Sequence, residues 1–571
     1  MHDMTSADTS TICAIATPPG GALGIIRLSG PQAIEHTAAL FAPAGKRLWP
    51  TRQGGTVTFG EITDPSTGET VDEVLVSLFR SPHSYTGEDC TEISCHGSSY
   101  IMNRILQLLI TQGCRMAKAG EYTERAFLNG KMDLSQAEAV ADLIASSTAA
   151  NHQMAMRQMR GAFSGELHAL RDQLLHITAL LELELDFSDH EDLEFASRDE
   201  LAALAHQIHD RISRLCQSFR LGNALKRGVP VAIVGETNAG KSTLLNALIG
   251  EERALVSDVH GTTRDTVEET VVIDGSLVRF IDTAGIRQTK DTVERMGIRR
   301  TFDKIEEADI VLWVIDATEP REQYRRLCHQ VEHSDKLTLL IVNKSDLLDE
   351  RSTRELQNFL EQAEASAHAV QREQANMAAN PEYEANTPPL TENETSQGED
   401  TNLSTTEGNV LAWNAAAPAR YGRPLNQPAH PEAGYEGLPT ESQNAPTGNG
   451  EYPQPAYSRP LQPPIHPLFL SARSPQDIER LRHALSNILS QMQQGFSVEN
   501  EVIVSNARHY EALSQALAAI DRVAGGLSNH LSGDFVAQDL RECIHHLSDI
   551  AGDVTTNAVL HTIFERFCIG K

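Results

Sequence analysis

The stretch Gly235-Glu236-Thr237-Asn238-Ala239-Gly240-Lys241-Ser242 follows the apolar run of residues 229–234. It fits G-x-x-x-x-G-K-[ST], the pattern of a phosphate-binding loop between a buried strand and a helix. Its glycines permit a tight turn that points backbone N–H groups at a triphosphate. Lys241 supplies a positive charge, and the Ser242 hydroxyl supplies a ligand for Mg²⁺. The sequence therefore predicts a nucleotide as the first ligand to consider.

Three later segments follow apolar runs in the order that a GTP site requires. Asp282-Thr283-Ala284-Gly285 offers a carboxylate for the outer shell of the metal and a glycine N–H for the γ-phosphate. In Asn343-Lys344-Ser345-Asp346, the final carboxylate can accept two hydrogen bonds, from N1–H and from the exocyclic amine of guanine. Adenine offers no such donor pair, so the pattern favours GTP over ATP. Ser471-Ala472-Arg473 is expected to close over the base.

The segment Gly261-Thr262-Thr263-Arg264-Asp265 lies where the first switch of a GTPase is expected. Its Thr263 hydroxyl is predicted to complete the Mg²⁺ shell together with Ser242, with Thr262 nearby. The full set of predicted GTP-binding residues is Asn238, Ala239, Gly240, Lys241, Ser242, Thr243, Ser257, Asp258, Val259, His260, Gly261, Thr262, Thr263, Asp282, Thr283, Ala284, Gly285, Asn343, Lys344, Ser345, Asp346, Ser471, Ala472 and Arg473.

Ile286 occupies the position at which Ras-like GTPases carry the glutamine that orients the attacking water. Because isoleucine cannot hydrogen-bond water, hydrolysis needs another group. Asn238 in the phosphate loop and Glu294 are the two candidates, and Lys241 is the third predicted catalytic residue. From the residues alone, Glu294 is better explained as a solvated charge on a helix.

The composition limits the classes of function. A formal net charge of -30, from 48 basic and 78 acidic residues, argues against a protein that coats nucleic acid non-specifically. The eight cysteines include no C-x-x-C pair and are expected to be reduced thiols of a cytoplasmic protein. The N-terminus lacks the features of a signal peptide, and no run of about 18 apolar residues occurs, so we expect no membrane association.

The chain of 571 residues predicts a multidomain protein. Helical periodicity on both sides of the GTP motifs indicates an α/β P-loop GTPase domain of the Ras-like kind inserted into a discontinuous α-helical domain. Because 15 of the 25 prolines fall between Pro381 and Pro467, a long insert inside the GTPase domain is predicted to be disordered. The expected boundaries are 1–125 for an N-terminal α+β domain, 126–227 and 493–571 for the two parts of the helical domain, and 228–492 for the GTPase domain, with its insert at about 349–466.

Four motifs together resemble the MnmE (TrmE) family of tRNA-modification GTPases. They are Ala16-Thr17-Pro18-Pro19-Gly20, the block 124–134, Asn238-Ala239-Gly240-Lys241-Ser242, and the final Phe567-Cys568-Ile569-Gly570-Lys571. The resemblance covers the chain except for the insert. It implies a homodimer formed through an N-terminal folate-binding domain, and an FAD-dependent partner, MnmG (GidA), in a hetero-oligomer. Together they would add an aminomethyl or carboxymethylaminomethyl group at C5 of the wobble uridine of certain tRNAs, with the carbon from 5,10-methylene-tetrahydrofolate.

The same resemblance implies roles for particular residues. The folate contacts would be Arg27, Glu92, Lys131 and Lys571, although each alone could be a surface charge or part of a structural ion pair. Hydrolysis would be activated by K⁺, held by Asn238, Ser257, Val259 and Thr262, while Glu294 orients water. Cys568 could act as a nucleophile in the modification or could be a packing cysteine. One departure is Glu236-Thr237, where the family usually has Arg-Pro.

A second function stays open at this point. The chain could be a regulatory RNA-binding GTPase switch of the ribosome-assembly type, like Era and Der, without modification chemistry of its own. Der would need a second phosphate loop and Era a KH module with G-x-x-G near the end, and neither pattern is seen in the sequence.

Overall fold

The computed structural model describes residues 10–45, 49–186, 197–250, 268–281, 305–332, 336–363, 467–492, 501–553, 557–565, 567, 569 and 570. Several predicted site residues therefore lie outside the described part of the chain. These are the first-switch residues 257–263, the segment 282–285, Glu294, Cys568 and Lys571. Most of the predicted insert, residues 364–466, also lies outside it.

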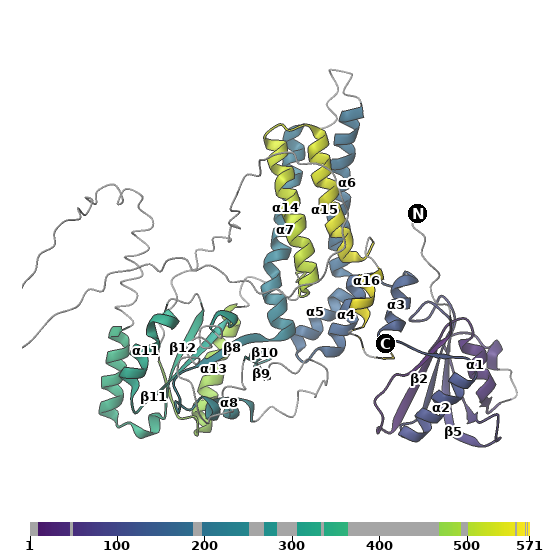
Figure 1. The fold of residues 1–571 in the computed structure, drawn as a ribbon, viewed down its shortest axis with the longest axis horizontal. Helices are drawn as coiled ribbons and strands as arrows, with labels where there is room; N and C mark the ends of the chain where they lie inside the picture. The colour runs from purple at the N-terminus through teal and green to yellow at the C-terminus, as the bar shows by residue number, and fades with distance from the viewer. Residues whose placement is uncertain are drawn as a thin grey trace, which may run out of the picture. The chain divides into compact units, whose positions relative to one another are not determined.

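The N-terminal part is built on one seven-stranded sheet in the order β3-β4-β5-β6-β2-β1-β7 (Figure 1). Strand β5 shows why one face is the core: Val74, Val76 and Leu78 are buried, whereas Leu75 between them is exposed. The elements are β1 (Ile12–Ile15), β2 (Leu23–Ser29), α1 (Ala33–Leu40), β3 (Phe41–Pro43), η1 (Trp49–Thr51), β4 (Thr56–Thr63), β5 (Thr70–Phe79), β6 (Cys90–His96), α2 (Ser99–Thr111), β7 (Arg115–Met116) and α3 (Glu121–Leu128). Residues of α1 and α2 cover the buried face.

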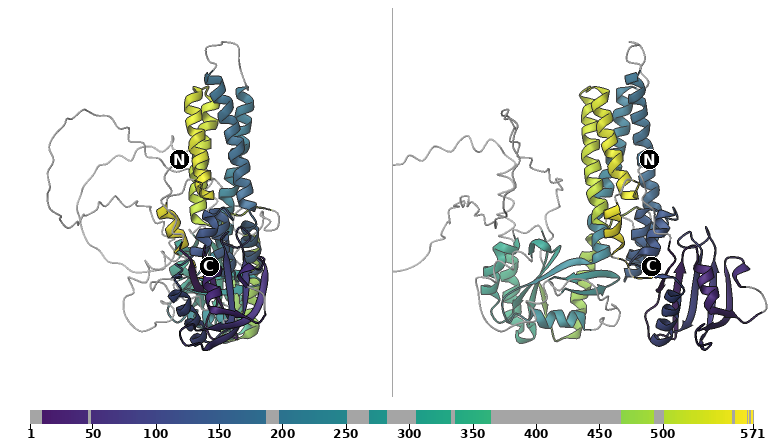
Figure 2. Two further views of the ribbon diagram at one scale, coloured as in Figure 1. Left: turned by 90° about the vertical axis from the view of Figure 1, so that its right-hand side faces the viewer. Right: turned by 45° about the vertical axis from the view of Figure 1, so that its right-hand side comes forward.

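The helical domain is assembled from two stretches of chain that flank the GTPase segment. Leu167, Leu170 and Leu174 recur at helical spacing on α6 and share one core with Leu513 and Leu540 of the second stretch. The elements are α4 (Leu134–Ala145), α5 (Ala149–Met159), α6 (Ala162–Asp186), α7 (Arg198–Arg227), α14 (Ala507–Ser528), α15 (Gly533–Ala551) and α16 (Asn557–Phe564). Helices α14 and α15 run beside α6 and α7 in every view (Figures 1 and 2), which confirms the predicted discontinuous domain.

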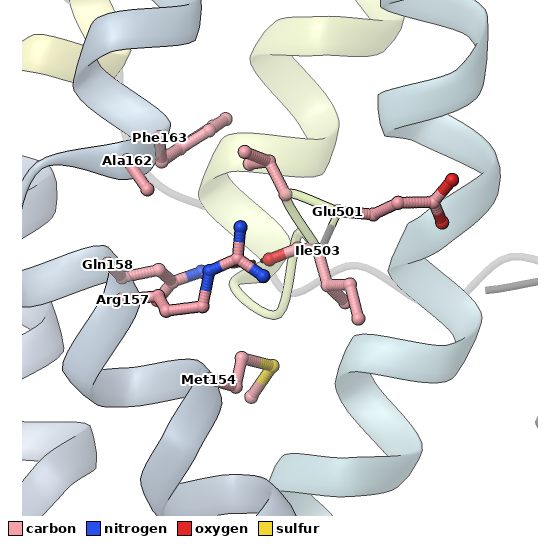
Figure 3. Close-up of a pocket in the computed structure, with 8 residues that line it drawn as sticks. Met154, Arg157, Gln158, Ala162, Phe163, Glu501 and Ile503 are labelled. Atoms are coloured by element: carbon pink, nitrogen blue, oxygen red, sulfur yellow. Dashed lines mark hydrogen bonds between the residues drawn. The ribbon is translucent and has the colours of Figure 1, made fainter. Parts of the chain in front are cut away.

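The segment that returns from the GTPase domain to α14 is fixed by hydrogen bonds between its backbone and side chains of the helical domain. The side chain of Gln158 on α5 donates to the carbonyl of Ile503 at 2.9 Å (Figure 3). The N–H of Val504 donates to the Ser218 hydroxyl on α7 at 3.0 Å. A Cβ on Gly222 would lie 2.0 Å from the Val504 carbonyl oxygen, so only glycine fits there. The second tether of the GTPase domain is thereby held on both α5 and α7.

The GTPase segment forms a six-stranded sheet in the order β13-β12-β11-β8-β10-β9, in which only β9 is antiparallel to its neighbour. Its elements are β8 (Val229–Val234), α8 (Lys241–Ile249), β9 (Glu269–Ile273), β10 (Ser276–Phe280), β11 (Ile310–Asp316), α11 (Pro320–Glu332), β12 (Leu337–Asn343), η2 (Ser345–Leu347), β13 (Leu468–Leu470) and α13 (Pro475–Met492). Helices α8 and α13 pack on one face and α11 on the other. The predicted α/β fold is confirmed, and the structure adds that helices cover both faces of the sheet. Ligands of such sheets bind at the carboxyl ends of the strands.

One boundary is corrected. Residues 350–363 form a helix, although the sequence predicts that the loose insert starts at about residue 349. Asp349 accepts the Ser352 N–H at its beginning, and Leu356 and Leu360 are buried in the core on the α11 face of the sheet. These contacts hold residues 350–363 in a helix against the sheet. None of the helices in the described ranges combines the length and apolar character needed to cross a membrane.

Candidate nucleotide-binding site

The phosphate loop takes a backbone path that only certain residues allow. Gly235, Asn238 and Gly240 have φ values of 151°, 67° and 93°. A Cβ on Gly235 would lie 2.1 Å from the Val314 carbonyl oxygen, and one on Gly240 would lie 2.0 Å from the Asn343 side-chain nitrogen. Asn238 is exposed, and asparagine tolerates the left-handed region better than most residues. The glycines of the motif are therefore required by close packing as well as by the turn.

Lys241 begins α8 with its side chain turned onto the loop. Its Nζ donates to the carbonyl of Gly235 at 2.8 Å and to that of Glu236 at 2.6 Å. Within the described residues, no hydrogen bond engages the Ser242 hydroxyl in the next position. The unpaired N–H groups of a helix N-terminus attract anions, so α8 points the positive end of its dipole at the loop. This arrangement suits a phosphate group with a cation beside it.

Asn343 at the end of β12 joins the phosphate loop to the base-closing segment. Its side-chain nitrogen donates to the Ala239 carbonyl at 2.8 Å, and its side-chain oxygen accepts the N–H of Ala472 at 3.0 Å. The residue is only 2% exposed, so both bonds are shielded from water. Ser471 is fixed in turn, because its N–H donates to Asp477 at 2.9 Å. Three segments predicted to bind one nucleotide thus meet through a single amide.

The predicted base-recognition residues differ in what holds them. Lys344 has a φ of 63°, and its ammonium group forms an ion pair with Asp316. Asp346 is exposed, and in the part of the chain that the structure describes nothing hydrogen-bonds or pairs with its carboxylate. Thr243 and Arg473 are exposed as well. The free carboxylate of Asp346 is the acceptor that a guanine edge needs.

Asp316, the last residue of β11, was not among the predicted site residues. Its carboxylate also accepts the N–H of Thr318 at 2.9 Å and the Thr318 hydroxyl at 2.8 Å. Burial raises the pKa of this carboxyl, but the hydrogen bonds from Lys344 and Thr318 outweigh it, so the net pKa is lowered. The sequence offered one signal for this residue, because an aspartate directly follows the apolar run of residues 310–315 that forms β11.

A second group of predicted residues gathers in the N-terminal part. Arg27 forms an ion pair with Glu92 at 2.8 Å, and its Nη1 donates to the carbonyl of Gly570 at 3.2 Å. The guanidinium lies 5.9 Å from the ring centroid of Tyr85. Lys131 donates to the carbonyl of Pro82, at the start of the same loop, at 2.9 Å. Arg27, Glu92 and the end of the described chain are therefore in contact, while Lys131 contacts the neighbouring loop.

The mainly parallel sheet, the phosphate loop at the end of β8 and the N-K-x-D segment at the end of β12 define a P-loop GTPase domain. Residues 134–568 match the family described as MnmE helical domain, and residues 11–131 match the GTP-binding protein TrmE N-terminus. The tRNA modification GTPase MnmE of Bacteroides thetaiotaomicron is 46% identical over 564 residues, which cover 98% of this chain and 99% of the relative. The namesake from Phocaeicola vulgatus is 44% identical over 603 residues and the whole of both chains. The chain belongs to the MnmE (TrmE) family.

Among solved structures, the FeoB G-domain from Methanococcus jannaschii is similar to 21% of this chain and 69% of its own chain, with 27% identity and a TM-score of 0.16. The assignment to the family rests instead on the matches that extend over the full chain.

Proposed function

We propose that this chain is a cytoplasmic GTP hydrolase that acts in tRNA modification. With an FAD-dependent MnmG-type partner, it would add an aminomethyl or carboxymethylaminomethyl group at C5 of the wobble uridine, with the carbon from 5,10-methylene-tetrahydrofolate. The observation that carries the choice of GTP is the exposed carboxylate of Asp346, which has no partner among the described residues. It follows Asn343, whose side-chain amide reaches the phosphate loop. The names of the relatives, tRNA modification GTPase MnmE, support the tRNA substrate.

The test of this function is nucleoside mass spectrometry of tRNA from cells that lack the protein. We expect the C5 modification of wobble uridines to be lost, and to return with the wild-type gene but not with a Lys241→Ala variant. Lys226→Ala, which removes the same charge from α7 in the helical domain together with its ion pair to Asp142, serves as the control for loss of a lysine away from the phosphate loop. Unchanged modification in the deletion strain would favour the regulatory switch instead.

The proposed cation sites use Ser242 and Thr263 for Mg²⁺, and Asn238, Ser257, Val259 and Thr262 for K⁺. Two features of the described residues fit them: the Ser242 hydroxyl has no hydrogen-bond partner there, and Asn238 is exposed on the loop. When bound, the cations would neutralise charge that develops on the phosphates. Glu294 is proposed to orient the attacking water. GTPase rates in K⁺ buffer should exceed those in Na⁺ buffer, and Asn238→Ala should abolish the difference; equal rates for the wild type would refute activation by K⁺.

The proposed folate site consists of Arg27, Glu92, Lys131 and Lys571. The contact of Arg27 with Glu92 and with the Gly570 carbonyl supports a shared site near the end of the chain. Folate carries pterin donors that suit a carboxylate and a glutamate tail that suits cations. Calorimetry with a tetrahydrofolate derivative should show weaker binding for Arg27→Ala and Lys131→Ala. If both variants bind folate as tightly as the wild type, the proposed folate site is wrong. Arg27 then only forms an ion pair with Glu92, and Lys131 only contacts the neighbouring loop.

A homodimer through the N-terminal domain is supported by the open face of its sheet. Phe59 of β4 and Leu75 of β5 are register partners, and they are 51% and 47% exposed. Val57 beside them is 59% exposed. Three neighbouring apolar side chains on a sheet face favour coverage by another protein surface. Light scattering should show a dimer that Phe59→Glu separates into monomers, whereas Tyr100→Glu, an exposed aromatic on α2, should leave it intact.

A further inference from the structure

Glu236 places an acidic side chain inside the loop that is predicted to hold a triphosphate. Its carboxylate accepts a hydrogen bond from Nη1 of Arg326 on α11 at 3.1 Å. Arg326 also pairs through Nη2 with Glu322, one turn earlier on the same helix. The Glu236 side chain is 25% exposed and that of Arg326 is 59% exposed. The pair therefore links the phosphate loop to α11 at the surface of the GTPase domain.

The main chain of Glu236 holds the lysine of the loop. Its carbonyl accepts the Nζ of Lys241 at 2.6 Å. One residue is thus connected through its backbone to the cation expected to meet the phosphates, and through its side chain to α11. Tyr324 of α11 and Val234 at the end of β8 belong to one buried core, so the helix lies firmly beside the strand that leads into the loop.

The charges explain why the pair matters for an anionic ligand. A free carboxylate inside a phosphate-binding loop would repel the phosphate groups, because like charges separated by less than the Debye length of about 8 to 10 Å still interact near a protein surface. The Arg326 guanidinium is charged throughout the physiological range, as in any arginine. The hydrogen bond with Glu322, and next the charge of Glu236, raise its pKa further. An ordinary surface ion pair is worth little, but this one has one partner inside a binding loop.

We propose that Arg326 is a positioning residue of the nucleotide site, which neutralises the Glu236 carboxylate and keeps it on the α11 side of the loop. The inference rests on the GTP binding proposed above.

The experiment is a double-mutant cycle of Arg326→Ala and Glu236→Gln, with Mg²⁺-GDP and a Mg²⁺-bound non-hydrolysable GTP analogue as the calorimetric probes. Arg326→Ala should weaken binding by about five- to twenty-fold, more for the GTP analogue with its extra charge. Glu236→Gln alone should bind as tightly as the wild type or more tightly. The double variant should match Glu236→Gln within about two-fold.

Arg325→Ala is the matched control, because Arg325 is exposed on the same helix and its side chain has no partner among the described residues. It removes the same charge and should leave affinity unchanged. The loss in Arg326→Ala should shrink as salt is raised, and circular dichroism melting should show that all variants are folded.

Two results would overturn the inference while the proposed function stands. A double variant as weak as Arg326→Ala would mean that the arginine acts on the nucleotide directly or through the fold. An equal loss of nucleotide affinity in Arg325→Ala would mean that any positive charge on α11 supports binding, without a specific pair with Glu236. A wild-type protein that binds neither probe would overturn the proposed GTP function itself, and this inference with it.

Discussion

The side-chain oxygen of Asn343 accepts the N–H of Ala472 at 3.0 Å, although the two residues are 129 positions apart in the chain. The same amide donates to Ala239 on its other side. The predicted insert lies between Asn343 and Ala472 in the sequence. The hydrogen bond between these two residues nevertheless brings both ends of the intervening segment to the phosphate loop. The nucleotide site is therefore closed by a buried contact whose geometry does not depend on the length of the intervening chain.

Asn343→Asp should disrupt this junction. The aspartate carboxylate can still accept the N–H of Ala472. It has no N–H to donate to the Ala239 carbonyl, so that carbonyl loses its hydrogen bond and faces a buried negative charge. We expect a loss of about 3 kcal/mol in the stability of the GTPase domain, the range for a buried group left unsatisfied, together with weaker nucleotide binding. Denaturant unfolding measures the first and calorimetry the second. Asn246→Asp makes the same change on the exposed side of α8 and should have little effect.

Asp346→Asn should change the base that is preferred. The asparagine amide can donate where the carboxylate could only accept, so the C2 carbonyl of xanthine replaces the exocyclic amine of guanine as its partner. We expect GTP affinity to fall by about a hundred-fold, as for the loss of a charged, paired hydrogen bond, and XTP affinity to rise. Asp349, three residues further on, caps the helix 350–363. The control substitution Asp349→Asn should therefore not alter the preference for guanine. Unchanged preference for GTP would show that Asp346 does not read the base.

Asp316→Asn should loosen Lys344. The substitution removes the ion pair and leaves the lysine held only by its strained backbone, so we predict nucleotide affinity about ten-fold lower. The pKa of Asp316 is lowered in the folded protein, so its contribution is complete above the ordinary aspartate pKa of about 4. That contribution is lost only as the pH falls through the lower folded value. The affinity gap between the two proteins should accordingly be constant from pH 6 to 8; a gap that closes within this range would contradict the assignment.

Glu138 on α4 is predicted to make the helical domain sensitive to acid. Its carboxylate pairs with His509 at 2.5 Å and with Arg508 at 3.1 Å, both on α14. Burial raises the pKa of Glu138, but His509 and then Arg508 lower it by more than burial raises it. The net pKa is about 2, compared with the ordinary value of 4.5. Because the folded pKa is depressed, up to about 3 kcal/mol of stability is present above pH 4.5 and is lost as the pH falls towards 2.

Urea unfolding of the wild type and of Glu138→Gln at pH 6, 4 and 3 measures this effect. The variant should be less stable at pH 6 and should lose less stability on acidification. Glu166→Gln removes a carboxylate from an exposed pair with Arg211 and should follow the wild type. Parallel acid profiles for the wild type and Glu138→Gln would place the acid-sensitive group elsewhere.

The parts of the site that follow from local pattern were predictable. A glycine-rich loop after an apolar run, and an N-K-x-D segment after another, have the same meaning in any chain of this kind. The discontinuous helical domain also followed, because helical periodicity is visible on both sides of the GTPase motifs. The helix 350–363 was missed because its support comes from the distant core on the α11 face.

Other features depend on packing between segments that the sequence does not place together. Asp316 and Lys344 meet because β11 and β12 are parallel neighbours whose last residues are in register. Glu236 and Arg326 meet because α11 covers the end of β8. Nothing in the spacing of these residues, 28 and 90 positions apart, reveals the pairing. Predicting them requires the order of the strands and the face on which each helix packs.

The shared core of the helical domain has a consequence for synthesis. The apolar side of α6 and α7 is completed by α14 and α15, but α14 begins at Ala507, 280 residues after α7 ends at Arg227. At about 5 to 20 residues per second, the ribosome needs about 15 to 55 seconds to make that interval. During this time the leucines of α6 lack their final partners, while the GTPase domain is translated. The nascent chain must therefore pass through a stage in which a long apolar stripe is open, and a chaperone that binds such stripes has its opportunity there.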